Sequence, residues 1–106
     1  MKKIITLCGS WRFSAQMERI AEELELEQGV LVLGITPHVL GRELTDAEKE
    51  RLGRLHLRRI DLADAILVVN IGGYIGESTR REMDYARLQG KEILYWEAMR
   101  GSIGRK

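Results

Sequence analysis

The chain has little of several features that define whole classes of protein. It contains one cysteine, Cys8, and one proline, Pro37, among 106 residues. With one cysteine we expect no internal disulfide, no cysteine-based metal site and no metal, and we expect Cys8 to be a small buried hydrophobic residue. The formal net charge is only +1, which gives no global electrostatic basis for binding a nucleic acid polymer or a membrane surface.

Long apolar runs are also missing. Those present have the length of strands, far below the roughly 20 residues that a membrane-spanning helix needs. The first apolar stretch stops at Ser10 with no small-residue cleavage site after it, so we expect no signal peptide and a cytoplasmic location. With 44% hydrophobic and 31% charged residues, the composition is that of a globular protein, and we expect one domain spanning residues 1–106.

Apolar runs alternate with helical spacing along the whole chain. The apolar runs predict strands over 3–8, 30–35, 65–70 and 92–96, and the helical spacing predicts helices over about 13–28, 45–62 and 79–88. The run 30–35 is too apolar and β-branched for an exposed position. This order predicts a parallel sheet with right-handed helical crossovers. The fold class is therefore α/β, a small three-layer Rossmann-like or flavodoxin-like sandwich with a four- to five-stranded parallel sheet.

Other signals refine this outline. Residues 45–48 form a capping box that starts the second helix, whose inward stripe we expect to include Leu52, Leu55, Arg59 and Leu62. The basic, glycine-containing segment 99–106 is expected to be mobile or held by a partner. Because four strands make a thin core, we expect a homo-oligomer, in the first instance a dimer, formed through an exposed helix face.

Two loops are candidates for a ligand site. Residues 72–82, which begin Gly-Gly-Tyr-Ile-Gly-Glu-Ser, follow the third strand and open a helix with Glu82 in its first turn, and residues 8–12 follow the first strand. In the common strand order 2-1-3-4 these strands are neighbours, so both loops reach one crevice at the carboxyl edge of the sheet. Glycines let the backbone approach a ligand closely, and free N–H groups at a helix start favour an anion.

Several residues in these loops have both a functional and an ordinary interpretation. The guanidinium of Arg12 suits a phosphate or carboxylate, with Ser10 completing the cradle; equally, Arg12 is a solvated side chain and Ser10 a helix cap. Tyr74 either anchors its loop or forms a wall for a nucleobase. Glu82 either supplies a reactive carboxylate or, in the capping-box pattern 79–82, only satisfies backbone donors.

Other motifs are weak. His56 and His38 lack a carboxylate pattern that would make them metal ligands, and a structural or solvated role is the ordinary interpretation of each. The glycine loop lacks the Gly-Lys-Ser/Thr ending of a P-loop, and the first strand is not followed by a dinucleotide-binding fingerprint. The sequence therefore gives no indication of a cofactor.

From about residue 3 to residue 96 the chain resembles the nucleoside 2-deoxyribosyltransferase family and its relatives that hydrolyse 2'-deoxynucleoside 5'-monophosphates. The stretch 82–86, Glu-Met-Asp-Tyr-Ala, resembles the family's Glu-Leu-Gly-Tyr-Ala, whose glutamate is the nucleophile and falls on Glu82. The Gly-Ser-x-Arg that holds the 5'-phosphate in the monophosphate hydrolases falls on Gly9, Ser10 and Arg12. A Gln-Gly-Lys before the closing strand, residues 89–91, is also shared.

The resemblance implies a reaction. A glutamate attacks C1' of the deoxyribose while the base departs, and water or a second base then resolves the glycosyl-enzyme. Ser78 and Gly76 at the helix start would assist binding. Further expected substrate contacts are Thr6, Trp11, His56, Tyr74 and Glu77. The chain also differs from the family: Thr6 stands where the family has a tyrosine, Gly76 where it has an aspartate or a phosphate-binding serine, and His56 where it has an aspartate.

Two other hypotheses remain open at the level of sequence. The missing acid at Gly76 favours a non-catalytic module that binds or senses a nucleotide. A third hypothesis is an interaction subunit whose glycine loop is purely structural. The enzyme hypothesis predicts a nucleoside or its 5'-monophosphate as the small-molecule partner, with hydrolysis favoured over transfer.

Overall fold

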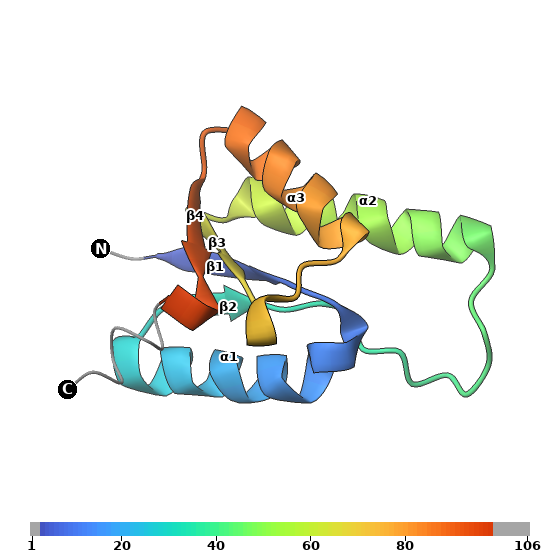
Figure 1. Ribbon diagram of the computed structural model, residues 1–106, viewed down its shortest axis with the longest axis horizontal. Helices are drawn as coiled ribbons and strands as arrows, with labels where there is room; N and C mark the ends of the chain where they lie inside the picture. Colours follow the sequence, from blue (N-terminus) through green and yellow to red (C-terminus); the bar gives the residue numbers. More distant parts are fainter. Residues whose placement is uncertain (1–2, 99–106) are drawn as a thin grey trace.

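The computed structural model describes residues 3–98, and the structural statements below concern that part of the chain. Its strands form one parallel sheet in the order β2-β1-β3-β4 (Figure 1). The strands are β1 (Ile4–Cys8), β2 (Leu31–Leu33), β3 (Ala65–Val68) and β4 (Glu92–Tyr95), the helices are α1 (Ser14–Gln28), α2 (Asp46–Leu62) and α3 (Glu77–Leu88), and the short 3-10 helices are η1 (Trp11–Phe13) and η2 (Ile71–Gly73). The predicted α/β fold with strand order 2-1-3-4 is confirmed.

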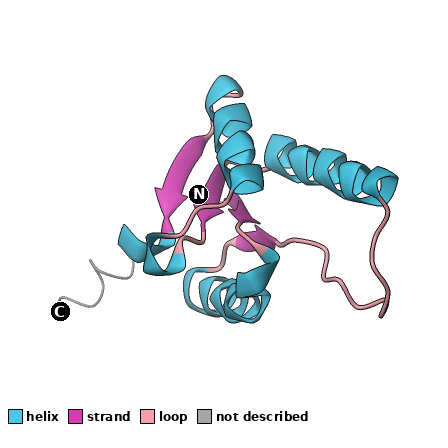
Figure 2. Cartoon of the chain, turned by 45° about the vertical axis from the view of Figure 1, so that its right-hand side comes forward, coloured by secondary structure: helices cyan, strands magenta, loops and turns pink. Residues whose placement is uncertain are grey.

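The sheet lies between two helical layers. Helix α1 covers one face, and α2 and α3 cover the other (Figures 1 and 2). Met17, Ile20 and Leu24 of α1 pack against the first face, and Ile60 of α2 with Met83 of α3 packs against the second. Burial of apolar surface on both faces explains why β1 and β3 read as continuous apolar runs.

Strand β2 differs from its prediction. The apolar run 30–35 was expected to be a buried strand, but only Leu31–Leu33 is a strand, and Leu31 is 52% exposed. The physical reason is its position at the edge of the sheet, where it pairs only with β1. An apolar run alone does not distinguish an edge strand from a central one.

Helix α2 presents a different face to the core from the one predicted. The inward positions are His56 and Ile60, one turn apart, whereas Leu55 and Leu62 are 40% and 67% exposed. Figure 1 shows that the N-terminal half of α2 projects beyond the sheet, so only its C-terminal turns rest on the strands. The prediction followed the leucines and missed an inward face that carries a histidine.

The ends of the elements agree with capping rules in one helix and correct the prediction in another. At α2 the predicted capping box is present, because Thr45 Oγ1 accepts from Glu48 N at 3.1 Å and Glu48 Oε1 accepts from Thr45 N at 2.9 Å. Helix α3 begins at Glu77 rather than at residue 79, with Gly76 as its N-cap.

In the described part of the chain no helix is both long and apolar enough to cross a membrane. The segment 99–106, which was predicted to be mobile or held by a partner, lies outside the described residues.

Candidate functional site

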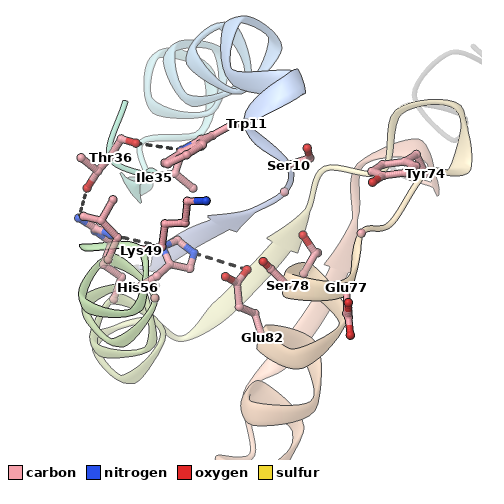
Figure 3. A pocket seen from close by; sticks show the side chains of 16 residues that line it. Ser10, Trp11, Ile35, Thr36, Lys49, His56, Tyr74, Glu77, Ser78 and Glu82 are labelled. Atoms are coloured by element: carbon pink, nitrogen blue, oxygen red, sulfur yellow. Dashed lines mark hydrogen bonds and ion pairs between the residues drawn. The ribbon is translucent and has the colours of Figure 1, made fainter. Parts of the chain in front are cut away.

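A pocket of about 410 Å³ opens at the carboxyl ends of β1 and β3 (Figure 3). It is bounded by the loop after β1, the segment after β2, helix α2 and the start of α3. Its lining residues are Gly9, Ser10, Trp11, Ile35, Thr36, Lys49, Leu52, Gly53, His56, Arg59, Tyr74, Gly76, Glu77, Ser78, Thr79 and Glu82. Ligands of open parallel sheets bind at this edge.

Glu82 points into this pocket from the second turn of α3 (Figure 3). The capping-box interpretation placed Thr79 at the N-cap and Glu82 in the first turn. The structure corrects this, because the N-cap is Gly76 and Thr79 is the third helical residue, with its side chain buried. Glu82 is therefore too far along the helix to satisfy the free N–H groups of the first turn.

Burial controls the protonation of Glu82. Its side chain is only 18% exposed. Desolvation raises its pKa to about 7, while a hydrogen bond with Cys8 and the positive charge of Arg81 oppose that rise. A carboxyl group with a pKa near neutrality, facing a pocket, is typical of a reactive group rather than of a surface charge.

His56 lies next to Glu82 in the pocket. Its Nε2 lies 3.9 Å from Glu82 Oε1, and its side chain is 7% exposed. Burial and the adjacent Arg59 guanidinium lower its pKa to about 4. Arg59 Nη1 lies 3.4 Å from His56 Nδ1, and Arg59 Nη2 donates to Thr36 Oγ1 at 3.0 Å. The imidazole is therefore neutral at pH 7, so the pair is a neutral histidine beside a titrating carboxyl group.

Cys8 is the third member of this cluster, beside His56 and Glu82. It is fully buried at the end of β1, with Sγ 3.6 Å from His56 Nε2. Burial, followed by the charge and hydrogen bond of Glu82, raises the pKa of the thiol. The donor atoms of Cys8, His56 and Glu82 lie within 4.8 Å of one another. Sequence spacing does not indicate this cluster, because its members come from three different elements.

Of the residues predicted to bind phosphate in the loop after β1, two line the pocket and Arg12 does not. Ser10 lines the pocket, and its Oγ also accepts from Arg12 N at 3.2 Å, as a cap of η1. Arg12 does not line the pocket; its Cζ lies 4.1 Å from the centroid of the Tyr74 ring. Gly9 lines the pocket too, and a Cβ there would lie 3.2 Å from Val69 Cβ.

The glycines of the loop after β3 mainly permit its backbone conformation, and one of the three lines the pocket. Gly72 and Gly73 have φ values of +65° and +81°, which glycine adopts readily, and neither lines the pocket. Gly76 does line it, and a Cβ at that position would lie 3.2 Å from the Tyr74 hydroxyl. The Tyr74 hydroxyl thus occupies the space beside position 76.

The other predicted contacts divide into two groups. Trp11, Tyr74, Glu77 and Ser78 line the pocket. Trp11 donates from Nε1 to Thr36 O at 3.1 Å, and its ring stacks on His38 with centroids 5.4 Å apart. Thr6 does not line the pocket; it is fully buried and donates from Oγ1 to Arg59 O at 2.8 Å.

Two cationic pocket residues were missed by sequence reasoning. Lys49 and Arg59 both line the pocket from α2, and Figure 3 shows the Lys49 side chain extending into it near Trp11. The signal that could have found them is helical spacing, because positions 49, 52, 56 and 59 follow the Thr45 cap at intervals of three or four.

No protein-family model matches this chain, and no curated protein does.

Proposed function

We propose that the protein hydrolyses the N-glycosidic bond of a 2'-deoxynucleoside 5'-monophosphate, with Glu82 as the nucleophile. The observation that carries the proposal is the position of Glu82, which is partly buried, free of a capping role and directed into the pocket. The resemblance of residues 82–86 and of the pocket residues Gly9 and Ser10 to the deoxyribosyltransferase family supports the same reaction.

The chemistry follows from one carboxylate. Glu82 attacks C1' of the sugar, the bond between C1' and the base nitrogen breaks, and the base leaves with the electron pair and takes a proton from solvent. Water then attacks C1', the bond between C1' and the Glu82 oxygen breaks, the proton of the water passes to solvent, and Glu82 is released as a carboxylate. The transition state has oxocarbenium character, which an anion beside C1' stabilises. Neutral His56 adds no charge that would neutralise Glu82.

The pocket also offers partners for a phosphate group. Glu77, Ser78 and Thr79 form the first turn of α3 and line the pocket. The free N–H groups of a first turn and the helix dipole favour an anion there. Lys49 supplies a positive charge from the opposite wall. A monophosphate uses these groups, whereas a free nucleoside leaves them without an anionic partner.

Size and aromatic lining fit a mononucleotide. The volume of about 410 Å³ lies within the roughly 300–1,000 Å³ of small-molecule sites. The rings of Trp11 and Tyr74 line the walls, and flat apolar surfaces of this kind stack on nucleobases. Both features are consistent with a base held between loops while the sugar reaches Glu82.

The direct test is the release of free base. Purified protein is incubated with each 2'-deoxynucleoside 5'-monophosphate, and the free base is quantified by chromatography beside Glu82→Gln and the control Glu22→Gln. We expect release by the parent and by Glu22→Gln, whose side chain is exposed on α1 and does not line the pocket, and none by Glu82→Gln. Equal release by Glu82→Gln would overturn the assignment of the nucleophile.

One observation favours a second function, a non-catalytic nucleotide-binding module. At Gly76 the family carries an acid or a serine, and here the Tyr74 hydroxyl lies beside that position. In that case no base is released from any monophosphate, while a nucleotide still raises the melting temperature of both the parent and Glu82→Gln. Binding at 100 times Kd stabilises a protein by about 2.7 kcal/mol, so the shift is readily measured.

A further inference from the structure

Three side chains that bind metals lie close together at the pocket, each from a different element: His56 and Glu82 line the pocket, and Cys8 is fully buried next to them. Cys8 ends β1, His56 lies on α2 and Glu82 lies on α3. Cys8 Sγ is 3.6 Å from His56 Nε2, His56 Nε2 is 3.9 Å from Glu82 Oε1, and all three donor atoms lie within 4.8 Å of one another. Three ligand atoms at this spacing can all contact one metal ion placed between them.

These separations match a zinc coordination sphere. With Zn–S about 2.3 Å and Zn–N about 2.0 Å, tetrahedral angles put sulfur and nitrogen about 3.6 Å apart, and nitrogen and carboxylate oxygen about 3.3 Å apart. The Cys8–His56 distance already has this value. Glu82 reaches the second value by a shift of less than about 1 Å, which a side chain open to the pocket can make.

We propose that Cys8, His56 and Glu82 form a Zn²⁺ site with three protein ligands and a fourth position facing the pocket. Thiolate, imidazole and carboxylate are the ligands that zinc uses, whereas Mg²⁺ and Ca²⁺ prefer oxygen donors alone. The thiolate and the carboxylate balance the charge of the ion, and the thiol proton passes to solvent on binding. Cys8 then has a role that the sequence did not indicate.

Arg59 is the group that must adjust. Coordination through His56 Nε2 requires the proton to be on Nδ1, and Arg59 Nη1 lies 3.4 Å from that atom. Arg59 also donates through Nη2 to Thr36 Oγ1 at 3.0 Å, so it can keep this bond while Nη1 turns away. Replacement of Arg59 by glutamine therefore removes a competing donor and tightens zinc binding.

The ion and the proposed glycosidase share Glu82. A carboxylate bound to zinc has a coordinated lone pair and is no longer free to attack C1', so zinc inhibits base release; this consequence alone rests on the proposed function. Binding of the metal does not rest on it. The test below therefore measures binding directly, and its outcome is separate from any result on base release.

Cobalt provides the test, because Co²⁺ occupies zinc sites and its absorption spectrum reports its ligands. Metal-free full-length protein is titrated with CoCl₂. We expect one Co²⁺ per chain, intense tetrahedral d–d bands and a thiolate-to-cobalt charge-transfer band in the near ultraviolet. ZnCl₂ should remove these bands and MgCl₂ should not. The wild-type spectrum is decisive without any variant: absence of the thiolate band overturns the site.

Variants then identify the ligands. Cys8→Ser should lose the charge-transfer band, and both Cys8→Ser and His56→Ala should lose more zinc affinity than the roughly 10–100-fold that an outer-shell change costs. Matched controls are His38→Ala, the other histidine, and Glu77→Gln, another pocket carboxylate; both should bind zinc like the parent. Circular dichroism verifies that each variant is folded. Unchanged zinc affinity in folded Cys8→Ser contradicts the proposal.

Discussion

At the scale of single residues, the environment of Glu82 decides when it can react. Burial raises its pKa to about 7, against the opposing effects of Cys8 and Arg81. In the proposed reaction the nucleophile is the ionised form, and the ionised fraction grows as the pH rises through the pKa. We therefore expect protonation of Glu82 below that pKa to remove the proposed activity.

We predict that kcat/KM for the monophosphate rises from pH 5 to pH 8 with a midpoint near 7, in buffer with a chelator. Below the midpoint it should fall about tenfold per pH unit, because kcat/KM reports the pKa values of the free enzyme. Arg81→Gln should raise the midpoint, since the charge of Arg81 lowers the pKa of Glu82. Arg80→Gln is the neighbouring control and should leave the midpoint unchanged. A flat profile between pH 5 and pH 8 argues against ionisation of Glu82.

Lys49 yields a prediction about substrate choice. Lys49→Gln removes a positive charge from the pocket wall, so KM for the 5'-monophosphate should increase roughly tenfold, as expected for a hydrogen bond to a charged group. KM for the free nucleoside should stay the same. Steady-state kinetics on both substrates measures the difference. Lys91→Gln, a lysine outside the pocket that donates to Asp61 O, is the control; an equal loss for both substrates contradicts the phosphate role.

The location of Glu82 at the pocket could be predicted from the family resemblance of residues 82–86, but the absence of a capping role for Glu82 could not. The capping-box pattern at 79–82 is a local signal, and it misplaced the start of α3 because Gly76 serves as the N-cap without a side chain. The cluster of Cys8, His56 and Glu82 depends on three elements meeting in space. No local pattern contains that information.

At the scale of elements, two glycines differ in whether their backbone conformation accepts a side chain. Gly73, in the turn after β3, has φ +81°, whereas Gly53 lies within α2, where a Cβ would meet no atom within 4 Å. A Cβ is strained at the first and favoured at the second.

We predict that Gly73→Ala lowers the free energy of unfolding by about 1 kcal/mol and that Gly53→Ala raises it by up to about 1 kcal/mol. Denaturant unfolding of both variants beside the parent measures these changes, and each variant serves as the control for the other. Effects of the same sign would contradict the assigned turn geometry or the helical position of Gly53.

Element order was predictable because apolar strands and helical spacing alternate so regularly. The inward faces and the end residues of the elements were less predictable. Helix α2 turns His56 and Ile60 inward, and a search for leucines at helical spacing selects the wrong side. Strand β2 ends at Leu33 because it lies at the sheet edge, a position that depends on the neighbours of the strand.

At the scale of the whole molecule, exposed leucines on α2 indicate a contact surface. Leu55 and Leu62 lie two turns apart on one side of the helix and are 40% and 67% exposed. Apolar side chains that recur on one helix face favour self-association in a protein with a thin core.

We predict that light scattering coupled to size exclusion gives twice the mass of one chain, and that Leu55→Glu with Leu62→Glu gives the mass of a monomer. The control is Leu26→Glu, which alters an exposed leucine on α1, across the sheet from α2, and should leave the dimer intact. A parent that runs as a monomer at every concentration contradicts this surface.

The most direct test of the central claim is detection of the sugar on Glu82. A 2'-deoxy-2'-fluoro nucleoside 5'-monophosphate slows breakdown of a glycosyl-enzyme because fluorine destabilises an oxocarbenium-like transition state. The protein is quenched in acid after reaction, and peptides are mapped by mass spectrometry. We predict an added sugar phosphate on the peptide that contains Glu82, and none in Glu82→Gln. Base release without any adduct, or an adduct on another residue, would contradict Glu82 as the nucleophile.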